Sequence, residues 1–308
     1  MITTAIILWI LVAATAAFWG YASLIEPHQL CVRHIDVPMP NLPEALVGLR
    51  IAHLSDLHCT CRGASELFAR RVLAAIKRER PDLIAITGDI SSGWHHAACT
   101  ADCLRGLRAP HGVYAVLGNH DWNCTLETYL SGSPEPSPTV QDWEQALSQT
   151  EIQLLENKSC LLTLKGQTIA VVGVGDPSCG RDDIATALAG VGSADLKIML
   201  AHSPDALDLP GADWADLLLA GHTHGGQCRL PGLGSPWAPV WRMRRRSSGL
   251  MRSGQTLAYV SRGISAGMEA RFLCPPEVCI LTLRRGVAEK IPDVGLRTPA
   301  SPKRGEHQ

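Results

Sequence analysis

The sequence lacks an excess of charge of either sign. Its 308 residues include 28 Lys and Arg and 29 Asp and Glu, so the formal net charge is −1. A nearly neutral chain has no overall attraction to nucleic acid or to an anionic membrane. No extended basic stripe is present either, and we expect no nucleic acid among the partners. Hydrophobic residues make up 46% of the chain, which indicates a globular protein and excludes a disordered one.

The sequence also lacks the Cys-x-x-Cys spacing of zinc ribbons. It contains 11 cysteines, an odd number that cannot pair completely within one chain. Cys59 and Cys61 are separated by a single residue, and no disulfide framework is predicted. We interpret most of these cysteines as small buried hydrophobic residues or as loop thiols in a reducing setting.

No basic residue precedes Arg33, although a cleaved signal peptide normally has Lys or Arg before its apolar stretch. The chain carries no charge from Ala5 to Ile25, and crossing a bilayer takes about 20 apolar residues. We therefore predict a single-pass membrane anchor over residues 1–25, with a signal segment as the alternative. Because Arg33 follows the anchor, the rest of the chain is placed on the cytoplasmic face.

The central part of the chain alternates between strand and helix patterns. Short apolar runs at 50–55, 82–87 and 113–117 predict strands, and amphipathic stretches at 64–80 and 97–107 predict helices. This order predicts an α/β fold with buried parallel strands. The remaining predictions are a helix at 139–149 and strands at 152–156, 159–164, 168–174, 197–201, 215–220, 256–261 and 277–283. Residues 26–49 are predicted as a proline-punctuated connector, 50–290 as the main domain and 291–308 as a flexible tail.

Acidic residues, histidines and one asparagine directly follow the predicted strands. These side chains are Asp56, His58, Asp89, Asn119, His120, Asp121, His202, His222 and His224. Open α/β sheets build their sites at the carboxyl ends of strands. Buried aspartate and histidine must be paired or bound to metal, so no packing requirement explains this set. We interpret His53, on the first of these strands, as structural.

These donors suit Mn²⁺, Fe, Zn²⁺ or Mg²⁺. Asp56 and His58 alternate, so a sharp turn can aim both at one ion, and Asp89 can bridge two ions with its two oxygens. Two ions can lower the pKa of a shared water and neutralise the charge of a phosphoryl transition state. His120 would then lie near the leaving group, and Asp121 would orient its imidazole.

The series Asp-x-His, Gly-Asp, Gly-Asn-His-Asp, His and Gly-His-x-His resembles the calcineurin-like metallophosphoesterase family from residue 50 to about 283. The extended stretches at 221–227, 229–231, 261–264 and 271–277 resemble a bacterial, often membrane-associated branch. That branch includes manganese-dependent phosphoesterases and UDP-2,3-diacylglucosamine pyrophosphatases. The resemblance implies two facing sheets flanked by helices, with a dinuclear metal centre at one edge. The Arg-Arg export signal of some relatives is missing.

Carried over by position, the resemblance assigns Asp56, His58, Asp89 and His224 to one ion. It assigns Asp89, Asn119, His202 and His222 to a second ion, with His120 as the catalytic acid or phosphate contact. The metal expected from the branch is Mn²⁺.

The anchor and the tryptophan- and arginine-rich segment 237–246 favour a membrane-proximal or lipid-linked phosphodiester or pyrophosphate as substrate. For the segment itself, a solvated basic loop is the alternative. Two other hypotheses for the whole chain stay open: a phosphodiesterase or phosphatase for soluble substrates, and a metal-dependent binding module without catalysis. The expected location is the bacterial inner membrane.

Overall fold

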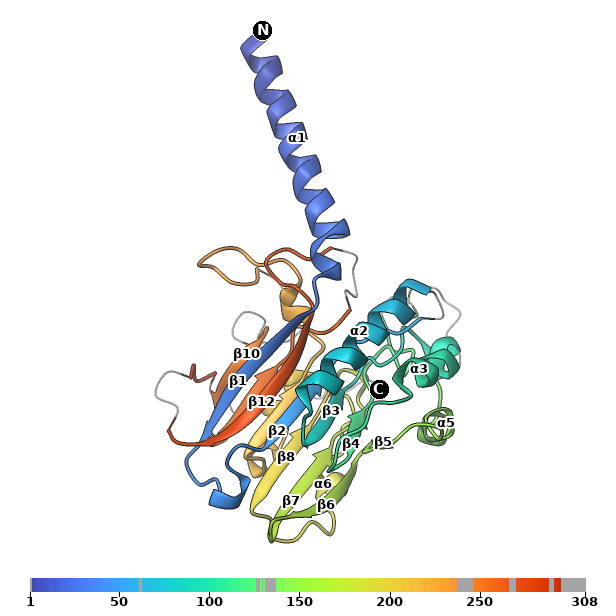
Figure 1. The fold of residues 1–308 in the computed structure, drawn as a ribbon, viewed down its shortest axis with the longest axis vertical. Coiled ribbons are helices and arrows are strands. Elements are labelled where there is room, and N and C mark those ends of the chain that lie inside the picture. Colours follow the sequence, from blue (N-terminus) through green and yellow to red (C-terminus); the bar gives the residue numbers. More distant parts are fainter. Residues whose placement is uncertain are drawn as a thin grey trace, which may run out of the picture.

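Figure 1 shows the protein as a computed structural model of the whole chain. The structure describes residues 2–60, 63–125, 128, 130, 137–236, 246–265, 270–287 and 291–294. The predicted segment 237–246 lies outside these ranges except for Arg246, and so do residues 295–308 of the predicted tail.

Two six-stranded sheets form the centre of the fold (Figure 1). The first has the order β1-β12-β2-β3-β4-β5, and its strands are β1 (Cys31–Met39), β12 (Glu277–Arg285), β2 (Arg50–Leu54), β3 (Leu83–Thr87), β4 (Val113–Val116) and β5 (Ile152–Leu154). The second has the order β10-β11-β9-β8-β7-β6, and its strands are β10 (Gly249–Ser253), β11 (Thr256–Val260), β9 (Leu217–Ala220), β8 (Leu196–Leu200), β7 (Gln167–Gly173) and β6 (Lys158–Leu164).

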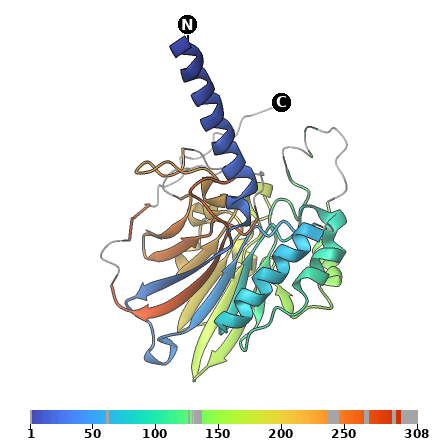
Figure 2. The same ribbon diagram turned by 45° about the horizontal axis from the view of Figure 1, so that its top comes forward.

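Apolar side chains fill three layers. Ile51, Leu83, Ile198, Leu219 and Tyr259 belong to the cluster between the sheets. Helices α2 (Gly63–Glu79), α3 (Ala97–Leu104) and α5 (Val140–Ala146) cover the first sheet, and their contacts include Val72, Ala101 and Trp143. The short helix α6 (Ile184–Leu188) packs against the second sheet. Figure 2 shows α2 lying along the face of the first sheet. The predicted two-sheet α/β fold is therefore confirmed.

The predicted connector 26–49 contains a strand that the sequence interpretation missed. β1 pairs in parallel with β12 over its whole length, with Cys31 opposite Glu277 and Met39 opposite Arg285. β1 lies at the edge of its sheet. An edge strand tolerates a proline such as Pro38, because one side of the strand has no hydrogen-bonded neighbour.

Two further differences concern the end of the chain. β10 was not predicted, and it pairs with β11 in an antiparallel hairpin. Residues 291–294 of the predicted tail pack against the domain instead, because Val294 is buried and its N–H donates to Arg252 O at 2.8 Å.

The N-terminal helix α1 (Ile2–Leu24) extends away from the sheets (Figure 1). It is long and apolar enough to cross a membrane, and of its residues only Ala22 is buried. The helix has no acidic residue in its first turn and no basic residue in its last. The length and apolar composition of α1 agree with the predicted N-terminal apolar helix.

Candidate metal centre

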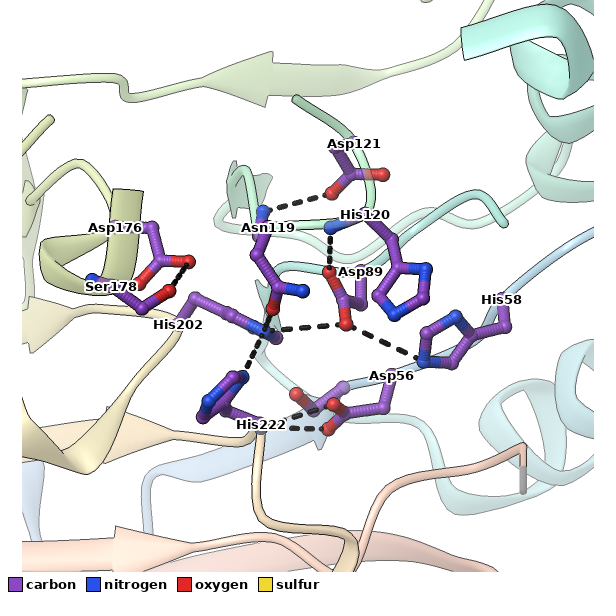
Figure 3. A network of polar contacts seen from close by, with 12 residues as sticks. Asp56, His58, Asp89, Asn119, His120, Asp121, Asp176, Ser178, His202 and His222 are labelled. Carbon is purple, nitrogen blue, oxygen red and sulfur yellow. Dashed lines mark hydrogen bonds and ion pairs between the residues drawn. The ribbon is translucent and has the colours of Figure 1, made fainter. Parts of the chain in front are cut away.

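Parallel strands bring the predicted site residues together, and Figure 3 labels all of them except His224. His224 belongs to the same group, because its ligand atom lies within 4.8 Å of those of Asp56, His58 and Asp89. β2, β3 and β4 run parallel in the first sheet, and β7, β8 and β9 run parallel in the second. Asp56, Asp89 and Asn119 therefore follow neighbouring strand ends of the first sheet. His202 and His222 follow β8 and β9 in the second sheet. The site residues therefore come from both sheets.

Five of these residues have left-handed backbone conformations. The φ angles are 52° at Asp56, 46° at His58, 47° at Asp89, 67° at His222 and 48° at His224. A side chain other than glycine rarely adopts positive φ, and such strain clusters at functional sites. Each strand end makes a sharp turn here, and the turns aim consecutive polar side chains at one point.

Asp56, His58, Asp89 and His224 form the first compact group. Each offers one ligand atom, and these atoms lie within 4.8 Å of one another. Nε2 of His58 is buried and has no hydrogen-bond partner among the described residues, although Asp89 Oδ2 lies 3.4 Å away. A buried nitrogen without a partner is costly unless a ligand is bound there. The group therefore fits a divalent cation.

The second group adjoins the first at Asp89. His202 Nε2 lies 3.2 Å from Asn119 Oδ1, 3.1 Å from His222 Nδ1 and 3.4 Å from Asp89 Oδ2 (Figure 3). The same carboxylate oxygen of Asp89 thus lies 3.4 Å from a histidine of each group. Its other oxygen accepts the backbone N–H of His120 at 2.9 Å, which fixes the orientation of the carboxylate.

The charges within the site keep the Asp89 carboxylate ionised and stabilise a positive charge beside it. Burial opposes ionisation of Asp89, but His202, His58 and His120 hold its pKa well below the usual value. Burial lowers the pKa of His58 to about 3, so its imidazole is neutral at pH 7. Burial also acts to lower the pKa of His202, yet Asp89 raises it well above the usual value. Positive charge is therefore stabilised between His202 and Asp89, whether a proton or a metal cation carries it.

Backbone carbonyls outside the centre orient the rings of His202 and His224 through their Nδ1 atoms. His202 Nδ1 donates to Thr87 O at 2.8 Å, and His224 Nδ1 donates to Ser265 O at 3.2 Å. In both rings this leaves Nε2 without a backbone partner and facing the centre, as in metal-binding histidines. The guanidinium of Arg271, which is fully buried, also donates to the Ser265 carbonyl.

His120 and Asp121 do not form the predicted pair. None of the hydrogen bonds within the described part of the chain joins Asp121 to the His120 ring. Instead, the Asp121 carboxylate accepts the N–H groups of Ile90, Ser91 and Gly118 at 2.9–3.1 Å. Asp121 thus ties two loops together, while the half-buried His120 ring lies 4.6 Å from that of His58.

The glycines before the ligands serve two different needs. Gly88 has a φ of 81°, as expected for a tight turn after a strand. Gly221 is required by close approach instead, because a Cβ there would overlap the hydroxyl of Ser55 and crowd Asp56.

Sequence reasoning missed Asp176, which lies beside His202 in Figure 3. It is fully buried and accepts the Ser178 hydroxyl at 2.6 Å. Its charge acts on the pKa of both His202 and His222. The Gly175-Asp176 pair follows strand β7 as Gly88-Asp89 follows β3, and this pattern was available in the sequence.

His53 and Cys99 lie outside the two ligand groups. His53 is fully buried, and its Nε2 lies 2.8 Å from the Thr87 hydroxyl, which confirms a structural position. Cys99 is disulfide-bonded, although no disulfide was predicted. Pairing depends on which helices and loops meet in space, and cysteine spacing alone does not reveal this.

Carboxylate and imidazole donors gathered at strand ends are the ligand types that metal-dependent hydrolases use. Residues 49–226 match the Calcineurin-like phosphoesterase family, and the chain belongs to that family. It is therefore a hydrolase that acts on phosphoester bonds.

Relatives match over most of their length. The chain is 30% identical over 277 residues to the metallophosphoesterase YkuE of Bacillus subtilis, covering 86% of this chain and 90% of that protein. It is 28% identical to the UDP-2,3-diacylglucosamine pyrophosphatase LpxG of Chlamydia muridarum, covering 88% and 94%. It is 29% identical to the phosphodiesterase YaeI of Escherichia coli, also covering 88% and 94%.

Proposed function

We propose that the site holds two divalent cations, with Mn²⁺ as the first choice, and that Asp89 bridges them. Asp56, His58 and His224 complete one set of ligands, and Asn119, His202 and His222 complete the other. The main support for this proposal is the position of Asp89 Oδ2, which lies 3.4 Å from Nε2 of both His58 and His202. When bound, such a pair of cations neutralises phosphoryl oxygens and acidifies water.

The protein's own side chains supply the remaining steps. As water attacks the phosphorus and the P–O bond of the ester breaks, the imidazole of His120, at the margin of the ligand groups, donates a proton to the departing oxygen. The backbone N–H of His120 keeps Asp89 oriented during this transfer. Asp121 holds the loops of Asp89 and Asn119 in register through its three backbone hydrogen bonds.

For the substrate, we propose a lipid-linked or membrane-proximal phosphodiester or pyrophosphate. The helix α1, which is long and apolar enough to cross a membrane, supports this class, and in this proposal it anchors the hydrolase in the bacterial inner membrane. The likeness to a UDP-2,3-diacylglucosamine pyrophosphatase over 88% of the chain supports the same class. A soluble phosphodiester is the second candidate, favoured by the similar identity to a phosphodiesterase.

The test uses the full chain, purified in detergent and supplied with Mn²⁺. We expect about two bound metal ions per chain and hydrolysis of bis-p-nitrophenyl phosphate. Asp89→Asn should reduce both, whereas Asp213→Asn, at an exposed position, should change neither. Metal-loaded protein that hydrolyses no phosphoester would contradict the proposal. UDP-diacylglucosamine in vesicles and soluble diesters then decide between the two substrate classes.

A further inference from the structure

The foot of α1 packs directly on a loop at the rim of the metal centre. The ring of Phe272 lies 4.8 Å from that of Phe18 and 6.3 Å from that of Tyr21. The N–H of Arg271 donates to the carbonyl of Ala22, a residue of α1 that is fully buried, at 2.8 Å. The helix is thus docked on the catalytic domain and is not joined to it only by a tether.

Glu26 extends this contact toward the ligands. Its buried carboxylate accepts the N–H groups of Leu273, at 3.0 Å, and of Cys274. The Cys274 thiol in turn donates to the carbonyl of the proposed ligand His224 at 3.4 Å. A short series of buried contacts therefore fixes the direction of α1 relative to the metal centre.

An apolar rim lies beside the foot of α1. We define the apolar rim as Leu230, Leu233, Phe272 and Leu273. The side chains of Leu230, Leu233 and Leu273 are exposed, with Leu233 at 75%. Backbone hydrogen bonds of 2.9 Å between Phe272 and both Gln227 and Arg229 join the two loops that carry the rim. Both loops lie at the foot of α1 in Figure 1.

The backbone of one rim residue, Leu273, is strained. Leu273 has a φ of 53°, a conformation that is rare for a branched apolar residue, and its side chain is nevertheless 45% exposed. The turn from Leu230 to Gly234 contains no charged residue. Exposed apolar residues that continue an apolar helix mark a surface that contacts lipid or protein.

We propose that the apolar rim lies in the surface of the same bilayer that holds α1, so that the metal centre opens toward lipid headgroups. This rests on the proposed function in one respect, that α1 spans a membrane. Lipid is the occupant because α1 and the rim are continuous through Phe18 and Phe272. A helix that leaves the bilayer at Leu24 places residues packed on its last turns at the interface.

The test places a tryptophan on the rim and another at the opposite end of the sandwich. Leu233→Trp is compared with Val287→Trp, because Val287 is equally exposed, at 74%, and follows the far end of β12. The nine residues of β12 separate the two ends by about 30 Å. The full chain is reconstituted into vesicles with and without brominated lipids, which quench tryptophan fluorescence at short range.

We expect brominated lipid to quench the emission that Leu233→Trp adds to the native signal and to leave the emission added by Val287→Trp unchanged. The proposal would be overturned if brominated lipid left the emission added by Leu233→Trp as unchanged as that added by Val287→Trp. A blue shift at position 233 without quenching would show a protein partner instead and would also overturn it. A chain that fails to float with vesicles rejects both the rim contact and the anchor.

Hydrolysis of soluble bis-p-nitrophenyl phosphate is measured on the same vesicles. Active but unquenched protein rejects only the rim contact. Quenched but inactive protein rejects only the hydrolytic role of the metal centre.

Discussion

At the scale of single residues, His120 differs from the other histidines of the centre. It is half-buried, and its ring carries no hydrogen bond to another described residue, so it is free to reach a substrate. The proposed ligands His58, His202 and His224 are buried. His222 is half-buried like His120, but its ring Nδ1 lies 3.1 Å from His202 Nε2. Accessibility and position together suit a proton donor and not a ligand.

We predict that His120→Gln lowers turnover of an alkyl phosphodiester by about 100- to 10,000-fold, the usual contribution of general acid catalysis. The loss should be much smaller for a nitrophenyl ester, because its leaving group departs without protonation. Rates for the two esters and bound metal per chain are the measurements. Equal losses for both esters, or loss of metal, would assign His120 a different role.

Gly221 shows how closely the chain packs behind the ligands. We predict that Gly221→Ala destabilises the fold by about 1–3 kcal/mol, because the added methyl group overlaps Ser55 and displaces Asp56. Bound metal should fall as well. Gly192→Ala is the matched control, since a Cβ there meets nothing within 4 Å. Thermal unfolding and elemental analysis check both variants, and similar behaviour of the two would refute the explanation.

At the scale of elements, Glu26 joins the foot of α1 to the loop of Leu273 and Cys274. We predict that Glu26→Ala costs about 2–4 kcal/mol, because two backbone N–H groups, of which that of Cys274 is buried, lose a charged acceptor. Glu44→Ala should have little effect, because the Glu44 side chain is 79% exposed and its ion pair with Arg285 lies at the surface. The midpoints of thermal unfolding in detergent compare the two variants. An unchanged midpoint for Glu26→Ala would show that the contact is not stabilising.

The strands that carry ligands were predictable because each is a short apolar run followed at once by a polar turn. β1 was not predictable, since the adjacent polar residues Arg33 and His34 break its alternation and Pro38 interrupts it. The strand becomes visible only through its pairing with β12, which lies at the other end of the sequence.

The ligand set was predictable for a similar reason, since its residues follow strand ends in a recognisable order. The residues that contact the ligands from outside the centre were not predictable. Arg271 acts on Ser265 and through it on His224, and its burial depends on packing against the foot of α1. The positive φ angles at Asp56 and Asp89 were equally hidden, because neither residue type requires them.

At the scale of the whole molecule, the two sheets must meet correctly for the two ligand groups to adjoin. Glu156 lies at this junction. Its Oε2 accepts the N–H of Leu117, just beyond β4 of the first sheet, at 3.3 Å. A Cβ on Gly175, just beyond β7 of the second sheet, would approach its Oε1. Oε1 is buried and has no hydrogen-bond partner among the described residues.

This environment makes stability depend on pH. Burial raises the pKa of Glu156 to about 7 from an ordinary value of 4.5, so the folded chain binds this proton more tightly than the unfolded chain does. The stabilisation from this proton is complete below pH 4.5 and is lost as the pH rises through 7. At 1.36 kcal/mol per unit, the difference between pH 4.5 and pH 8 is about 3 kcal/mol.

We predict that Glu156→Gln, which cannot ionise, removes this part of the pH dependence and raises the melting temperature more at pH 8 than at pH 5. The exposed Glu151, which pairs with Arg108 at 3.6 Å, provides the control, and Glu151→Gln should leave the profile unchanged. Thermal unfolding of the detergent-solubilised chain from pH 5 to pH 8 measures all three proteins. A Glu156→Gln profile parallel to that of the unmodified chain would mean that the carboxyl is already ionised at neutral pH. Glu156 would then be solvated or paired, and the junction between the sheets would be more open at this edge than the structure shows.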